Sequence, residues 1–187
     1  MNRVHSAGHV NAGNLECPDR ARMRPEGAVV MGTAGVGVDQ IIAIAKDRAD
    51  KAKVFESVQI QDGGLVCKAL GSAEEAHYRL TPRDGSLIVS LDMADRWQSE
   101  SIESTLMHTG DKLEELLDEE LAELGYEGDM PNYRHFRSDA LLFVFESTVP
   151  IGGLDTDDAG ERAAQFLLGY EACFRQLGDM DADGDED

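Results

Sequence analysis

Histidine side chains are the groups in this chain that could ligate a metal ion or act as a base. His5 and His9 stand four residues apart with Cys17 nearby, a spacing that on a helix would begin a metal site. Their glycine-rich surroundings show no helical pattern. The other histidines lack a second ligand at a recognisable spacing, and we expect ordinary surface or half-buried residues. They are His77, His108 and His135.

The cysteines favour a reducing compartment. Their number is odd and their spacing unpaired, which argues against a disulfide framework and favours the cytoplasm. Cys67 and Cys173 occupy core-facing positions, where a cysteine behaves as a small hydrophobe. The sequence contains no Gly-x-Ser-x-Gly, His-Glu-x-x-His or Cys-x-x-Cys motif. It therefore identifies no catalytic, cofactor-binding or metal-ligating residue, and we expect no cofactor.

Two segments match ligand-binding loops in part. Residues 32–37, Gly-Thr-Ala-Gly-Val-Gly, lack the Lys-Ser/Thr of a phosphate loop and the glycine spacing of a dinucleotide fingerprint, which favours a lead-in to a helix. The segment that begins at Asp179 matches the first six positions of a calcium loop, Asp-x-Asp-x-Asp-Gly. The glutamate required at position twelve is missing, so we expect an unstructured acidic tail and no calcium site.

Composition limits the partners of the protein. Its 187 residues, 42% of them hydrophobic, suffice for one well-buried core. The net charge of −20 argues against nucleic acid or an anionic membrane as a partner, because binding phosphates requires an excess of Lys and Arg. No apolar run approaches the ~18 residues of a membrane span. The weakly apolar stretch after Arg24 contains glycines and starts too far from Met1 for a secretory signal.

The first half of the chain predicts a helix followed by an antiparallel meander. Residues 1–38 show no apolar period and are expected to form a disordered or non-native extension. Asp39 is expected to cap a helix over about 39–51. The period then changes to two, and Asp-Gly turns at Asp62 and Asp84 indicate hairpins. The predicted strands are Lys53–Gln61, Leu65–Leu70, Glu75–Leu80 and Ser86–Met93.

The next segment predicts one long helix over about 98–124. Its apolar residues share a phase on both sides of Gly110, which favours a single helix bent at that glycine. They are Ile102, Leu106, Leu113, Leu116, Leu117 and Leu124. The far face is acidic, and such a face is either solvated or a docking surface for a basic partner. It carries Glu114, Glu115, Asp118, Glu119 and Glu123.

The last third predicts a strand and an amphipathic helix. After a polar connection at 127–137, the apolar run Leu141–Phe145 is typical of a strand covered on both faces, and we expect it to be the central strand. Thr156 or Asp157 is expected to cap the final helix and Gly178 to end it. Its apolar stripe comprises Ala159, Ala163, Phe166, Tyr170, Cys173, Phe174 and Leu177.

Together these elements predict an α+β fold: an antiparallel sheet of about five strands with three helices on one face, a two-layer sandwich. We expect a single domain at 39–178, between the extension at 1–38 and the tail at 179–187. The element order, with the strand Leu141–Val149 followed by the helix Ala159–Leu177, resembles the type III secretion chaperone-like fold, including the YbjN-type bacterial regulator family. The resemblance implies a small, acidic, non-enzymatic and often dimeric protein that binds segments of other proteins.

The functional hypothesis is therefore a cytoplasmic protein-binding, chaperone-like or regulatory module. The alternative is a small-molecule-binding protein or an enzyme with a pocket between sheet and helices. Trp97 is either an exposed anchor for a partner or a cap over the sheet edge, and we expect the cap. We also expect a homodimer, because one sheet has limited width for these helices. Its predicted contact residues are Leu113, Leu116, Leu117 and Leu124.

Overall fold

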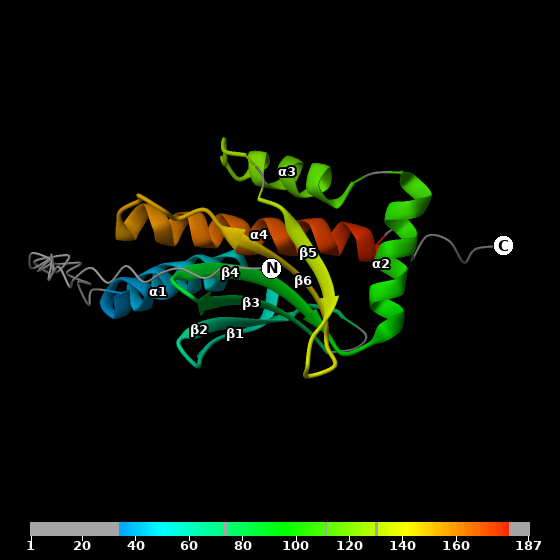
Figure 1. Ribbon diagram of the computed structural model, residues 1–187, viewed down its shortest axis with the longest axis horizontal. Coiled ribbons are helices and arrows are strands. Elements are labelled where there is room, and N and C mark those ends of the chain that lie inside the picture. The colour runs from blue at the N-terminus through cyan, green and yellow to red at the C-terminus, as the bar shows by residue number, and fades with distance from the viewer. Residues whose placement is uncertain (1–33, 73–74, 111, 130, 180–187) are drawn as a thin grey trace, which may run out of the picture. The chain divides into compact units, whose positions relative to one another are not determined.

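A computed structural model describes residues 34–72, 75–110, 112–129 and 131–179, all of which belong to one compact unit. Within these residues an antiparallel sheet has the strand order β1-β2-β3-β4-β6-β5, and helices pack on one of its faces (Figure 1). The α+β class is confirmed. The described residues form six strands and four helices, where the sequence predicted about five and three.

The elements follow the chain in the order helix, meander, two helices, hairpin, helix. They are α1 (Ala34–Ala52), β1 (Phe55–Gln61), β2 (Gly64–Ala69), β3 (Ala76–Arg83), β4 (Ser86–Met93), α2 (Arg96–Thr109), α3 (Leu113–Glu123), β5 (Tyr133–Arg137), β6 (Phe143–Val149) and α4 (Thr156–Asp179).

The predicted meander is confirmed, and its turns explain the register. Asp62 and Gly63 have φ values of 52° and 74°, and Asp84 and Gly85 have 52° and 77°. Two successive positive φ angles are typical of the tight hairpin turns whose twist matches that of the strands they join. These turns join β1 to β2 and β3 to β4.

The apolar run near Leu141 does not form the central strand. β6 lies between β4 and β5, so one strand separates it from the sheet edge. Leu141 itself has a φ of 64° and is 61% exposed, because it lies in the turn before β6. An apolar run does not distinguish a turn residue from a strand residue. The sequence therefore placed the start of the strand two residues too early, at Leu141 instead of Phe143.

The polar connection predicted at 127–137 contains the edge strand β5. Tyr133 and His135 pair with Ser147 and Phe145 of β6, on the face that the helices cover. The alternate residue Arg134 lies on the opposite face. The strand is short and carries Arg134, His135 and Arg137, so its polarity hid its period of two.

The predicted long helix is two helices. Gly110 ends α2 in the left-handed conformation, with a φ of 78°, and its N–H donates to the carbonyl of Leu106. α2 and α3 nevertheless share a phase because both pack against α4. The expectation that separate helices would have no common phase was wrong for that reason.

The predicted helix ends also need correction. α1 begins at Ala34, so Asp39 lies inside the helix instead of capping it, and residues 34–38 are not part of an extension. α4 begins at Thr156, and the Asp155 carboxylate accepts a hydrogen bond of 2.9 Å from the N–H of Asp158, which makes Asp155 the cap. α4 continues through Gly178 to Asp179.

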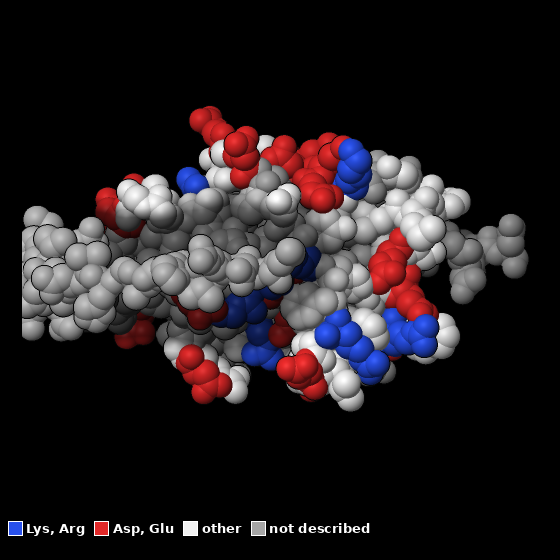
Figure 2. All heavy atoms as spheres, viewed as in Figure 1, with Lys and Arg blue, Asp and Glu red and all other residues white. Residues whose placement is uncertain are grey.

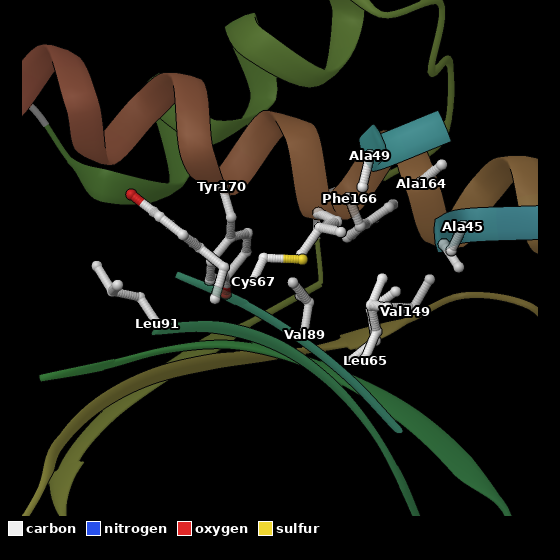
Figure 3. Close-up of a cluster of buried hydrophobic side chains, with 14 of the residues drawn as sticks. Ala45, Ala49, Leu65, Cys67, Val89, Leu91, Val149, Ala164, Phe166 and Tyr170 are labelled. Carbon is white, nitrogen blue, oxygen red and sulfur yellow. The ribbon is translucent and has the colours of Figure 1, made fainter. Parts of the chain in front are cut away.

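The core lies between the sheet and the pair α1 and α4. Figure 3 shows side chains from both helices meeting those of the strands below them, with Phe166 and Tyr170 of α4 above Val89 and Leu91 of β4. The predicted stripe of α4 is buried along its whole length. α1 and α4 touch closely at Gly160, where an added Cβ would lie 2.6 Å from the Cβ of Ile44.

α3 packs on the outer side of α4 (Figure 1), and its contacts bear on the expected dimer. Leu113 and Leu117 are 1% and 0% exposed within the single chain. An added Cβ at Gly169 of α4 would lie 2.9 Å from Leu121, so the two helices approach closely. Two of the leucines predicted at the dimer contact are therefore buried inside the protomer and are not available for that contact. The homodimer itself stays a prediction.

Trp97 does not cap the sheet edge. Its side chain is 75% exposed, in the first turn of α2, and its backbone N–H donates to the Asp95 carboxylate at 2.8 Å. The expectation of a cap was wrong because the buried side of α2 is the one that carries Ser99 and Ile102.

Candidate binding face of the sheet

The face of the sheet opposite the helices carries rows of polar and charged side chains. Strand pairing sets each row, because directly paired residues point to the same face. One row contains Lys68, His77, Asp92, Val144 and Phe136, and the next contains Val66, Arg79, Ser90, Glu146 and Arg134. The described helices pack on the other side of the sheet (Figure 1), and we call the side without them the open face.

A shared carboxylate joins two arginines on the open face. Arg83 of β3 donates to Glu146 Oε1 at 2.8 Å, and Arg134 of β5 donates to the same oxygen. Burial would raise the pKa of Glu146, but these hydrogen bonds and charges outweigh it and hold the pKa below its usual value. The Glu146 side chain is 6% exposed, whereas Arg83 and Arg134 are 43% and 67% exposed. The cations thus face solvent and the anion lies beneath them.

Further cations lie beside this group. Arg79 Nε lies 2.7 Å from Asp92 Oδ2, and Ser90 donates to the other oxygen of Asp92 at 2.8 Å. Lys68 pairs with Glu56 at 2.8 Å. Each cation of the open face therefore has an anionic neighbour, but the cations are the more exposed partners where the carboxylates are Asp92 and Glu146.

The open face carries several cations, whereas the chain as a whole has a net charge of −20. Figure 2 shows mostly acidic side chains over α3, and basic side chains interspersed with acidic ones over the strands in the lower half of the view. The acidic face of α3 predicted from the sequence is confirmed, with Glu114 and Glu115 in its first turn. An acidic ligand would meet repulsion over α3 and would find exposed cations on the open face.

A second polar group lies on the covered face at the middle of β5. His135 Nε2 is 3.1 Å from Ser99 Oγ, and His135 Nδ1 is 3.2 Å from Glu103 Oε1. The imidazole stacks on Phe145 with ring centroids 3.9 Å apart. The connectivity matches a serine, base and acid relay. Ser99 is 1% exposed, so a substrate does not reach its hydroxyl, and the group fastens α2 to β5.

This arrangement predicts an effect of pH on stability. Burial lowers the pKa of His135 below its usual value, and the Glu103 carboxylate opposes this. The folded state therefore favours the neutral imidazole, and the stability this contributes is present above the unfolded pKa of about 6.5 and is lost as pH falls below it.

Urea unfolding at about pH 7.5 and about pH 5.5 tests the effect. We expect the wild type to lose more free energy of unfolding on acidification than His135→Asn, which keeps a polar side chain but does not titrate in this range. An equal or smaller loss in the wild type would contradict the prediction.

The histidines and cysteines that the structure describes do not gather into a metal site. His77 is half-buried on β3 and His108 is exposed on α2. Cys67 and Cys173 are buried, as predicted, and burial raises the pKa of each thiol to about 12, so neither is a ready nucleophile. Among the described residues no three His, Cys, Asp or Glu side chains gather as metal ligands.

Other candidate segments lie partly or wholly outside the described residues. His5, His9 and Cys17 do so, as does the calcium-like sequence after Asp179. Of the glycine-rich segment, Gly35 and Gly37 lie inside α1, so this part is helix and not the lead-in that the sequence predicted before it.

An open groove of about 570 Å³ lies between α1 and the start of α4. Four of its charged side chains already pair with one another: Arg48 donates to Glu161 at 2.6 Å and 2.8 Å, and Lys51 donates to Asp47 at 2.5 Å. This groove is open to solvent and does not lie between sheet and helices, so it offers little support for an enclosed ligand site.

Sequence reasoning missed the open face for an identifiable reason. Arg79 and Arg83 alternate with apolar residues on β3, which signals a basic strand face. Arg134 completes the group only when β5 is recognised as a strand beside β6. The strand order brings these arginines together, and no local sequence motif predicts the strand order.

Comparisons with family models, with curated proteins and with solved structures find no match for this chain. The fold and the open face define an acidic α+β protein whose sheet carries cations on its helix-free side. None of the described helices is both long enough and apolar enough to cross a membrane.

Proposed function

We propose that the protein is a non-enzymatic cytoplasmic module that binds an acidic segment of another protein across the open face. The observation that carries the proposal is the set of exposed guanidinium groups on this face in a chain of net charge −20. A guanidinium group presents several N–H donors in a plane and suits carboxylate ligands.

Apolar contacts complement these charges. Phe136 is 36% exposed on the same face, and the Arg134 guanidinium lies 5.3 Å from the centroid of its ring. A segment with acidic residues and an occasional apolar residue would thus find both kinds of contact. The resemblance in element order to the type III secretion chaperone-like fold supports a segment-binding role, and partner recognition by proteins of this kind needs no cofactor.

Fluorescence anisotropy with the full chain and a labelled hexaglutamate peptide tests the proposal. We expect saturable binding that weakens from about 50 mM to about 300 mM salt, because surface charge attraction is screened. Arg79→Gln and Lys68→Gln should each weaken binding. Arg48→Gln is the matched control, since it removes an arginine of similar exposure that pairs with Glu161 on the helices.

Two outcomes would contradict the proposal. Tighter binding of hexalysine than of hexaglutamate would place the partner surface on the acidic face of α3 and make the ligand basic. Absence of saturable hexaglutamate binding at low salt would remove support for the open face and favour the alternative, a small-molecule site or an enzyme.

A further inference from the structure

Glu146 is an acidic residue at the centre of a face for which we propose an acidic ligand, so it needs an explanation. Its carboxylate receives hydrogen bonds from strands on both sides, Arg83 on β3 and Arg134 on β5. Both bonds end on the same oxygen, Oε1. The two guanidinium groups are thereby brought to one point above β6.

Both arginines keep donors for a ligand. A guanidinium group has five N–H donors, and each of these uses an Nη2 group on Glu146. With 43% and 67% of their side chains exposed, Arg83 and Arg134 present other N–H groups to solvent. Glu146 is only 6% exposed, so an incoming anion would bind outside it and would not replace it.

Resting on the proposed function, we infer that Arg83, Glu146 and Arg134 form an anion clamp that takes one carboxylate of the partner segment between the two guanidinium groups. Glu146 has two opposed effects in the clamp. It holds long side chains in place, which lowers the entropy lost on binding. It also cancels one of two positive charges, which limits affinity and keeps the bound segment exchangeable.

A phosphate monoester shares this chemistry, because guanidinium pairs bind carboxylates and phosphates through the same parallel N–H donors. The carboxylate is favoured here because the clamp has a net charge of only about +1, formed by two arginines and the ionised Glu146. A dianionic phosphate would bring excess negative charge to a face that already contains Asp92 and Glu146.

The decisive variant is Glu146→Gln, which keeps the shape and an acceptor oxygen but removes the charge. We expect hexaglutamate to bind this variant roughly two- to fivefold more tightly than the wild type, the range typical of one exposed charge interaction. Glu161→Gln is the matched control, because it removes the same charge from a carboxylate that also binds an arginine, on α4. It should change affinity much less.

The phosphate arm uses a glutamate peptide in which one residue is phosphoserine. Equal or weaker binding than hexaglutamate supports the carboxylate. Binding at least tenfold tighter than hexaglutamate, lost in Arg134→Gln, would overturn that assignment.

Circular dichroism first establishes that Glu146→Gln is folded. If it is not, Arg83→Gln, Arg134→Gln and their double variant carry the test. Two arginines that share one ligand should act together, so the affinity loss in the double variant should differ from the product of the single losses. Independent losses would show that the arginines bind separate groups.

The clamp and the proposed function fail in distinguishable ways. Hexaglutamate binding that is unaffected by Glu146→Gln and Arg134→Gln, yet lost in Arg79→Gln, would reject the clamp and leave the open face as the binding surface. Weaker binding to a folded Glu146→Gln protein would overturn the inference that the charge of Glu146 limits affinity.

Discussion

Replacing Phe166 with alanine is expected to lower the free energy of unfolding by about 3–5 kcal/mol, the cost typical of truncating a buried aromatic side chain. Phe166 is 0% exposed, and its ring meets that of Tyr126 edge to face, with centroids 5.1 Å apart. Figure 3 shows it between α4 and the strands. The change removes both the ring contact and the apolar surface that joins α4 to the core.

Urea unfolding followed by circular dichroism measures this effect. Phe136→Ala is the matched control, since the same truncation on the open face, where the ring is 36% exposed, should cost much less. A loss below about 1 kcal/mol for Phe166→Ala would mean that α4 does not seal the core as described.

Introducing a carboxylate at Leu117 is expected to unfold the protein. Leu117 is a residue of α3 and is 0% exposed. Leu117→Glu would bury an unpaired charge, at a cost of several kcal/mol. The free energy of unfolding of a typical domain is only about 5–15 kcal/mol in total. Leu124→Glu is the control on the same segment, because Leu124 is 37% exposed and a carboxylate there would be solvated.

Light scattering and circular dichroism together decide between two roles for Leu117. A folded Leu117→Glu protein that changes from dimer to monomer would place this leucine at a contact between copies. Loss of helical signal, with Leu124→Glu unchanged, would agree with its burial within the protomer. The expected homodimer itself would then require another surface.

The strands of the meander were predictable because their turns are local. Asp62-Gly63 and Asp84-Gly85 fix both the position and the type of each hairpin, and β4 has the bounds predicted, Ser86–Met93. The stripe of α4 was equally clear, since a broad apolar face over about five turns has few alternatives.

The errors arose where tertiary contacts override local pattern. Gly110 separates two helices whose common phase comes from a shared neighbour, α4, and not from continuity of the backbone. Similarly, β5 becomes a strand through pairing with β6, although its sequence is polar.

The candidate site was the least predictable part for the same reason. Arg83 and Arg134 are far apart in the sequence and meet only because β6 inserts between β4 and β5. Ser99 and His135 meet through the docking of α2, and no short motif contains both. Sequence reasoning listed His135 without finding either of its partners.

The pairing of β4 with β6 has a consequence for how the chain folds. Leu87 of β4 pairs with Val149 of β6, and the chain between these strands contains α2, α3 and β5. The pairs among β1 to β4, in contrast, join strands that are neighbours in the sequence. Closing a long loop costs more entropy than closing a hairpin, and contacts of high sequence separation slow folding. The meander can therefore form early. We expect the barrier to folding to lie at the step in which the hairpin of β5 and β6 reaches β4, with α4 following directly behind it to cover the completed sheet.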